Sequence, residues 1–158
     1  MVAISLTSAL FLYCLLIRLS GAAAAVSAAS RKIGGEEMGA AGDVWSELRE
    51  QRCDFFAGAP HAPVWRLSVP STAPRLDLGP QLIEWGGAQR WLLGIQDADR
   101  IRALAEQHGG HATLFRGGDR QAEVFHPLAA PVAAIHRNLK AAFDPAGIFN
   151  PGRMYAEL

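Results

Sequence analysis

The sequence is poor in cysteine and has no excess of charge of either sign, and both shortages exclude classes of protein. Two cysteines in 158 residues provide neither a disulfide framework nor a four-cysteine zinc site. Fifteen basic residues are balanced by fifteen acidic ones, and the densest cationic stretch is the pair Arg31-Lys32. Because phosphate binding requires an excess of Lys and Arg, we expect no nucleic-acid partner.

The sequence also lacks the short motifs of common catalytic and cofactor-binding sites. It contains no G-x-G-x-x-G, G-x-x-x-x-G-K-[ST], H-E-x-x-H or G-x-S-x-G pattern. Without a glycine-rich loop, the chain has no evident site for the pyrophosphate of a dinucleotide. His108 and His111 flank Gly109-Gly110, but the helix end expected at these glycines separates the two imidazoles, so we expect no metal site.

Charge is absent from the first segment as well. Residues 1–17 carry no charged side chain, and residues 10–17 are continuously apolar. Three interpretations fit such a segment: a buried strand, a secretory signal and a membrane anchor. No basic residue precedes the apolar run, whereas a signal normally has a basic start, so we favour the strand.

Hydrophobic residues make up 50% of the chain, and their periodicity indicates an α+β fold. Helices are predicted over 21–33, 43–56, 97–108 and 131–143, and strands over 65–69, 81–85, 90–95 and 111–116. This order suggests a ferredoxin-like, split β-α-β cap domain with an antiparallel sheet. The last helix and an Asn-Pro-Gly tail leave the sheet. We expect residues 1–158 to form a single domain.

Two sets of apolar side chains are expected in the core. One face of the final helix carries residues at steps of three and four: Val132, Ile135, Leu139 and Phe143. Four tryptophans lie in the predicted helices and strands: Trp45, Trp65, Trp85 and Trp91. They could form an aromatic binding face, but their positions favour a packed core.

Three arginines could bind a small carboxylate through two parallel hydrogen bonds, namely Arg66, Arg116 and Arg120. The alternative for each is a solvated surface position. Arg116 is the best placed of the three, because it ends a predicted strand beside Gly117-Gly118. Cys53 has only Arg52 as a basic neighbour and is expected to be an inert thiol.

The tail carries the most specific pattern in the chain. Residues 140–154, KAAFDPAGIFNPGRM, resemble the C-terminal hallmark of FAD-linked oxidases of the vanillyl-alcohol oxidase type. Asp144-Pro145 is expected to stop the helix, and Asn150-Pro151-Gly152 to form a tight turn. In that family the turn returns to the FAD-binding domain near the flavin. The resemblance therefore implies that Asn150, Pro151 and Gly152 contact the cofactor; the alternative is a turn without a ligand.

Two further stretches narrow the resemblance. Residues 110–117 (GHATLFRG), and residues 17–21 (IRLSG) followed by 33–36 (IGGE), look like the FAD-binding E-type subunits of bacterial glycolate oxidase. Trp45, residues 48–51 and Phe55-Phe56 fit the same family. The likeness extends over residues 16–155 and matches only the C-terminal, substrate-cap half of such a subunit. The N-terminal FAD domain of the family is therefore expected to be missing.

The resemblance carries functional expectations. It implies a fragment of an oxidoreductase subunit that uses FAD to oxidise a small 2-hydroxy acid, glycolate to glyoxylate. The implied partners are the other glycolate oxidase subunits, one a flavoprotein (D-type) and one an iron-sulfur protein (F-type). The implied location is the cytoplasm, with membrane association through the complex. FAD binding by the chain alone is doubtful, because the phosphate-binding loop is absent. Two alternatives remain: an inert, ferredoxin-like subunit-interaction module, and a small secreted domain.

Overall fold

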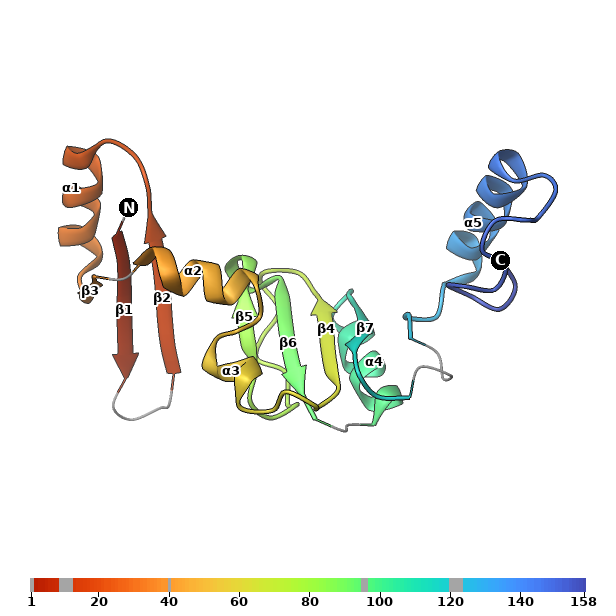
Figure 1. The fold of residues 1–158 in the computed structure, drawn as a ribbon, viewed down its shortest axis with the longest axis horizontal. Coiled ribbons are helices and arrows are strands. Elements are labelled where there is room, and N and C mark those ends of the chain that lie inside the picture. Colours follow the sequence, from red (N-terminus) through yellow and green to blue (C-terminus); the bar gives the residue numbers. More distant parts are fainter. Residues whose placement is uncertain (1, 9–12, 40, 95–96, 120–123) are drawn as a thin grey trace. The chain divides into compact units, whose positions relative to one another are not determined.

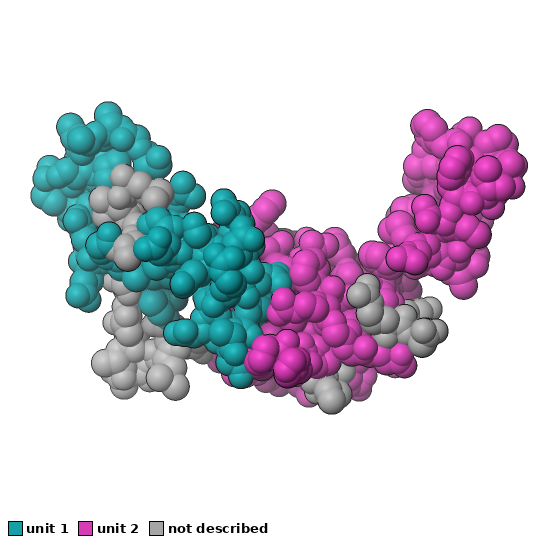
Figure 2. All heavy atoms as spheres, in the orientation of Figure 1, with its two compact units in different colours: residues 1–58 teal, residues 59–158 magenta. Residues whose placement is uncertain are grey.

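The protein is described by a computed structural model that covers residues 2–8, 13–39, 41–94, 97–119 and 124–158. The chain divides into two compact units, Met1–Gly58 and Ala59–Leu158 (Figure 2). Each unit has its own antiparallel sheet. The expectation of a single domain over residues 1–158 stays a prediction.

The first unit is built on a three-stranded sheet (Figure 1). Strands β1 (Val2–Ser8), β2 (Tyr13–Leu19) and β3 (Glu36–Met38) are ordered β2-β1-β3, and β1 pairs antiparallel with both neighbours. Strands β2 and β3 therefore run parallel to each other. Helix α1 (Ala23–Ile33) connects them, which makes a split β-α-β unit.

The apolar start of the chain differs from its prediction. Instead of one strand over residues 1–17, the sequence forms the two paired strands β1 and β2, in register from Val2↔Leu19 to Ser8↔Tyr13. The described side chains of β2 are exposed or half-buried, so the expectation of a buried strand is wrong there. The helix that follows is mostly alanine, and its short side chains cover little of a sheet.

The helix predicted over residues 43–56 is also two elements. Helix α2 (Ala41–Arg49) ends before Gln51, which adopts a left-handed φ of 54°. Helix α3 (Asp54–Ala57) then starts a new turn. Asp43 lies in the first turn of α2 rather than at its cap. In the first turn its negative charge interacts favourably with the positive end of the helix dipole.

The second unit contains a four-stranded sheet in the order β5-β6-β4-β7, with every pair antiparallel. Its elements are β4 (Val64–Ser68), β5 (Leu82–Glu84), β6 (Gln89–Leu93), α4 (Ala98–Gln107) and β7 (His111–Arg116). Strands β6 and β7 are parallel to each other on either side of β4, and α4 links them. This topology confirms the predicted α+β fold with an antiparallel sheet and a split β-α-β unit.

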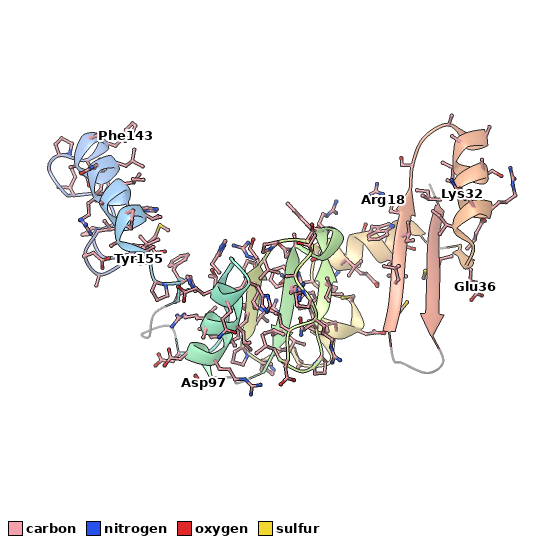
Figure 3. All side chains as sticks on the ribbon, turned by 180° about the vertical axis from the view of Figure 1, so that it is seen from behind. Arg18, Lys32, Glu36, Asp97, Phe143 and Tyr155 are labelled. Atoms are coloured by element: carbon pink, nitrogen blue, oxygen red, sulfur yellow. The ribbon has the colours of Figure 1, made fainter. Side chains whose placement is uncertain are left out.

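One face of this sheet packs on α4 to form the core. Trp65 and Leu67 of β4 alternate with Arg66 and belong to the core cluster, as do Leu92 of β6 and Ile101 of α4. The helix is well specified by its sequence: the Asp97 side chain accepts hydrogen bonds from the backbone N–H groups of residues 99 and 100 (Figure 3 labels Asp97).

Arg90 holds the long connection between β4 and β5 against the sheet. Only 2% of its surface is exposed, and its guanidinium donates to the carbonyl oxygens of Ala73 at 2.6 Å, Pro74 at 2.6 Å and Gly87 at 3.2 Å. Burial lowers the pKa of the Arg90 guanidinium from its ordinary value. The three carbonyl acceptors replace the water that this charge loses.

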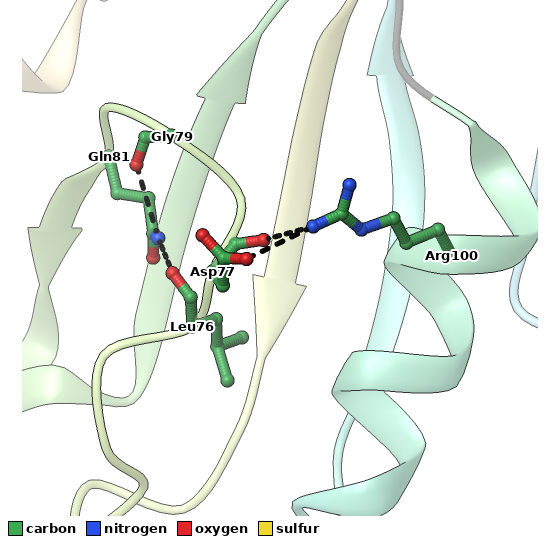
Figure 4. Close-up of polar contacts among 5 residues, drawn as sticks. All are labelled: Leu76, Asp77, Gly79, Gln81 and Arg100. Carbon is green, nitrogen blue, oxygen red and sulfur yellow. Dashed lines mark hydrogen bonds and ion pairs between the residues drawn. The ribbon is translucent and has the colours of Figure 1, made fainter.

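The same connection is fixed at its far end by contacts of Gln81 and Arg100 (Figure 4). Gln81 Nε2 donates to the carbonyl oxygen of Leu76 at 2.7 Å. Arg100 Nη2 lies 2.9 Å from the carbonyl oxygen of Asp77 and 3.3 Å from its carboxylate. Leu76 itself is buried in the core cluster, so these contacts position an apolar anchor as well as the loop.

The tryptophan prediction holds only in part. Trp65 and Trp91 are buried, and Trp45 is half-buried. Trp85 is 79% exposed and lies in the short 3-10 turn Trp85–Gly87, with a left-handed φ of 54°. That backbone conformation turns the chain between β5 and β6, and the Trp85 side chain stays outside the core.

Helix α5 (Ala130–Phe143) begins with Pro131 in its first turn, as predicted, and ends at Asp144. Its apolar stripe, however, is not buried by the described residues. The four stripe residues are all exposed: Val132, Ile135, Leu139 and Phe143. Phe143, which is labelled in Figure 3, is 83% exposed. The prediction that this helix buries them is wrong for the described chain, because no described surface covers the stripe. Within the described ranges, every helix is too short or too polar to span a membrane.

Candidate functional site

The Asn-Pro-Gly motif forms a tight, exposed turn after α5. The N–H of Arg153 donates to the carbonyl oxygen of Asn150 at 3.2 Å, which closes a four-residue turn. Gly152, at the third position of the turn, has a φ of 65°. Pro second and glycine third, with a positive φ at the glycine, is the pattern of a type II turn. Asn150 also has a positive φ, 46°, which Asn tolerates better than most residues.

The Asp144 carboxylate organises the loop that leads into this turn. Its two oxygens accept hydrogen bonds from the N–H groups of Ile148 at 3.1 Å and Phe149 at 2.9 Å. Lys140, one helical turn earlier, places its ammonium 2.6 Å from the same carboxylate. The Lys140 ammonium also donates to the carbonyl oxygen of Phe149. One buried acidic side chain thus ties the end of α5 to the start of the turn.

These contacts change the acidity of Asp144. The hydrogen bond from Lys140 is the main cause that lowers its pKa below the ordinary value of 3.8, and the N–H groups of Phe149 and Ile148 lower it further. Burial acts in the opposite direction. The carboxylate is therefore ionised at neutral pH, in the form that accepts all three donors.

Tyr155 connects the end of the motif to the segment after β7. Its hydroxyl donates to the carbonyl oxygen of His126 at 3.1 Å, and its ring lies 5.9 Å from that of Phe125 (Figure 3 labels Tyr155). Burial is the main cause that raises the pKa of Tyr155 above 10.0. The hydroxyl therefore remains a hydrogen-bond donor throughout the neutral range.

The turn lies next to a group of exposed apolar side chains. Ile148, Phe149 and Met154 are exposed in the tail, beside the exposed stripe of α5. Asp144, in contrast, is only 7% exposed. The local order of the tail therefore comes from hydrogen bonds, while its apolar side chains point outward.

The other predicted residues lie elsewhere. Arg116 is the last residue of β7, is exposed and pairs in register with Val64. Arg120 lies outside the described residues. His108 is the cap residue at the C-terminal end of α4, and His111 begins β7. Among the described residues, no three His, Cys, Asp or Glu side chains converge as a metal site would require.

Asp144 and Lys140 are the residues that sequence reasoning undervalued. The Asp-Pro pair predicts only a helix stop, whereas the carboxylate of Asp144 also holds the following loop. The spacing of four residues between Lys140 and Asp144 is the available signal, since residues at this spacing are neighbours on one helical face.

A flavin would need contacts to its ring and to its pyrophosphate, and the chain fits only the first. The turn is exposed, and a Cβ built on Gly152 would approach only the carbonyl oxygen of Ala156, at 3.8 Å. A flat group could therefore approach the turn closely. The 158 residues contain no glycine-rich phosphate loop. These residues fit one wall of a flavin site rather than a whole site.

Comparisons with known proteins agree with this motif. Residues 98–154 match the family described as FAD linked oxidases, C-terminal domain. The chain is 50% identical over 143 residues to glycolate oxidase subunit GlcE from Escherichia coli strain K12. The alignment covers 90% of this chain but 39% of that relative. No solved structure matches the chain significantly.

The matched segment 98–154 contains α4, β7, α5, the Asp144 network and the Asn-Pro-Gly turn. Residues 140–154, which carry the resemblance to FAD-linked oxidases, lie within this segment. The chain spans about 39% of the length of its GlcE relative. Residues 98–154 are thus similar to the C-terminal domain of FAD linked oxidases, and the chain is similar to a glycolate oxidase subunit.

Proposed function

We propose that this chain supplies the substrate-cap portion of the FAD-binding subunit of a glycolate oxidase. Residues 1–158 would together form that cap, and the flavin-carrying portion would come from the rest of such a subunit. The observation that carries the proposal is the Asp144-anchored turn within a chain 50% identical to GlcE. The turn is held by backbone hydrogen bonds, yet its residues are exposed.

The proposed cofactor contacts are Asn150, Pro151 and Gly152. The Asn150 side chain offers an amide donor and a carbonyl acceptor to the edge of a ring. Pro151 fixes its own φ, and Gly152 allows a close approach that a larger side chain would obstruct. When bound, FAD accepts the electrons of the substrate, while the protein binds and orients. The substrate would be a small 2-hydroxy acid, and Arg116 is the candidate that the sequence offers for its carboxylate.

The exposed apolar side chains of α5 and the tail support incorporation into something larger. We infer that this surface packs on the flavin-carrying portion of the subunit, since large exposed apolar patches commonly mark interaction sites. Further partners would be the D-type flavoprotein and the F-type iron-sulfur protein of the oxidase. Such an assembly would work in the cytoplasm, with any membrane attachment made through the complex.

A second candidate function is supported by the same apolar surface. A ferredoxin-like module that only joins subunits would also expose an apolar helix face. The two functions differ in what they require of the turn. A flavin site would use the exposed residues Asn150, Pro151 and Gly152 to contact FAD, whereas an interaction module would not. Flavin binding therefore separates them.

The test uses the chain alone and in a hybrid. Titrated with FAD, the chain alone should show no saturable quenching of flavin fluorescence below about 1 mM, because it lacks a pyrophosphate site. A hybrid in which this chain replaces the matching portion of GlcE should retain FAD and support glycolate-dependent dye reduction. A hybrid that folds but purifies without FAD would contradict the proposal and favour the interaction module.

A further inference from the structure

The sheet of the second unit has a second face, opposite the core that packs on α4. Along β4, Trp65 and Leu67 face the core, so Arg66 between them lies on the opposite face. Arg66 is paired across the sheet with Trp91 of β6 and with Thr113 of β7. Cross-strand partners share a face, so these three side chains lie on one surface.

A bulge adds an aromatic ring to this surface. The register between β4 and β7 shifts after the Trp65↔Leu114 pair, because Val64 pairs with Arg116 and Phe115 has no partner opposite it. The Phe115 ring lies 5.1 Å from the Trp91 ring, edge-on at 80°. The Arg66 guanidinium carbon lies 5.5 Å from the centre of the Phe115 ring. Bulges often re-aim a side chain next to a binding site.

The Arg66 guanidinium has no hydrogen-bond or ion-pair partner among the described residues. Arg90 donates to three carbonyl oxygens and Arg100 contacts Asp77, so their donors are already used. The Glu84 carboxylate on the neighbouring strand β5 accepts the indole N–H of Trp91 at 2.6 Å and the amide of Gln89 at 3.2 Å. Contact with Phe115 thus holds a half-buried guanidinium whose donors are not used by the described part of the chain.

We propose that Arg66, stacked on Phe115, binds the carboxylate of a small organic acid on this face of the sheet. A guanidinium matches a carboxylate with two parallel hydrogen bonds, and the ring beneath it reduces the freedom lost on binding. The Thr113 hydroxyl, one strand away on the same face, suits the 2-hydroxyl of such an acid. The choice of a 2-hydroxy acid rests on the proposed function; the carboxylate site itself rests on the geometry.

This assignment moves the carboxylate contact from Arg116 to Arg66. Arg116 is an exposed strand end, where water competes with a ligand for hydrogen bonds. Arg66 is half-buried beside the buried Trp91, and hydrogen bonds to charged groups strengthen as the surroundings become less polar. Phe115, at 42% exposed, leaves the ring accessible to a small ligand.

The experiment titrates the full chain, without FAD, with glycolate at constant ionic strength. The indole N–H of Trp91 is followed by NMR, because it lies beside the proposed site and its hydrogen bond to Glu84 fixes it. Glycolate should shift this signal saturably, with a Kd on the order of 1–10 mM, and acetate should bind more weakly. Chloride, added as sodium chloride, is the control anion and should not shift the Trp91 signal saturably.

Substitutions of Arg66 and Arg116 show which arginine causes the shift of the Trp91 signal. Arg66→Gln should weaken glycolate binding at least about tenfold, whereas Arg116→Gln should leave it unchanged. Should Arg66→Gln lose the dispersed amide spectrum of a folded chain, Arg66→Lys decides: it keeps the charge, loses the planar fork, and should still weaken binding severalfold. The assignment would be overturned if glycolate gave no saturable shift, or if the Arg66 variants bound glycolate as tightly as the unmutated chain. It would also be overturned if only Arg116→Gln lost glycolate binding.

Failure of the Arg66 site can be distinguished from failure of the proposed flavin role. In the GlcE hybrid, Arg66→Gln should leave the FAD content unchanged and raise the KM for glycolate more than it lowers kcat. A hybrid that binds FAD, together with a chain that ignores glycolate, would overturn the Arg66 site and leave the flavin role standing. If the chain alone binds glycolate through Arg66 but the hybrid holds no FAD, the Arg66 site stands and the flavin role is overturned.

Discussion

The sheet with α4 and the tail with α5 achieve their order in different ways. Around the sheet, apolar side chains from β4, β6, β7 and α4 enclose one another, and Leu67, Leu92 and Ile101 are fully buried. In α5 and the tail the large apolar side chains of the stripe and of Ile148, Phe149 and Met154 are exposed, and the carboxylate of Asp144 holds the loop between helix and turn. The first region is stable through its own packing, and the second presents a preformed surface.

The difference shows how one chain can separate folding from recognition. Burying an apolar side chain contributes about 1.5–3 kcal/mol, so the sheet region can hold itself together. Charge-assisted hydrogen bonds shape a short loop without using its apolar side chains. Ile148 and Phe149 therefore remain available to another surface, although their N–H groups are already bonded.

The largest contrast is expected from the same substitution in the two regions. Ile101→Ala leaves a cavity in the core and should reduce the free energy of unfolding by about 2–5 kcal/mol. Ile135→Ala, on the exposed face of α5, should change it by less than about 0.5 kcal/mol. Urea unfolding followed by tryptophan fluorescence measures both. Equal losses in the two variants would show that the α5 stripe is buried in solution.

A second, smaller effect tests the packing at the edge of the sheet. A Cβ on Gly110 would overlap the carbonyl oxygen of Ser68 and lie 2.9 Å from the Cα of Val69. Gly110→Ala should therefore cost about 1–3 kcal/mol, since backbone must move. The neighbour Gly109 is the control: it has a φ of 71° but space around it, so Gly109→Ala should cost about 1–2 kcal/mol. A smaller loss for Gly110→Ala than for Gly109→Ala would contradict the packing described.

In the tail, the expected effect is local. Asp144→Asn removes the charge that holds Lys140 and the N–H groups of Ile148 and Phe149. The amide exchange of Ile148 and Phe149 should rise by roughly tenfold, because hydrogen bonds to a charged group are the strong ones. The amides of β4 and β7 should keep their rates. Exchange that rises throughout the sheet would show that the two regions are not separable.

The same network should respond to acid. The folded pKa of Asp144 is lowered, so its contribution to stability is complete above the ordinary carboxyl pKa of 3.8 and is lost as the pH falls through the lower folded value. The tail should therefore keep its order at about pH 5 and lose it only at more acidic pH. NMR signals of Ile148 and Phe149 report this transition. A transition near pH 6 would point to a histidine instead, since its ordinary pKa is about 6.5.

The smallest effect concerns His108. This histidine is the half-buried cap residue at the C-terminal end of α4. His108→Ala should reduce the free energy of unfolding by no more than about 1 kcal/mol, because the side chain is not part of the core. It should leave the tail unchanged. Urea unfolding measures the difference, and a loss as large as that of Ile101→Ala would contradict this peripheral placement.

The sequence predicts those features of the fold and of the candidate site that depend on residues close together in the chain. Helix α4 was predicted almost to the residue, because Asp97 and the glycines after His108 act within one turn. The apolar periodicity of α5 identified a face to be buried but could not say what covers it. The break at Gln51 was missed, since a left-handed glutamine has no sequence signature. The bonds of Asp144 depend on the path of the following loop, which residue types alone do not determine.

The central claim is that the Asn-Pro-Gly turn forms one wall of a flavin site. Its most direct test is the FAD content of the GlcE hybrid carrying Gly152→Val, measured by absorbance against the unmutated hybrid and against His108→Ala. The β-branched side chain conflicts with the positive φ of Gly152 and occupies the space before the turn, so FAD content should fall severalfold while the sheet stays folded. His108→Ala should retain full FAD. Equal FAD content in the Gly152→Val and unmutated hybrids would show that the turn is structural only.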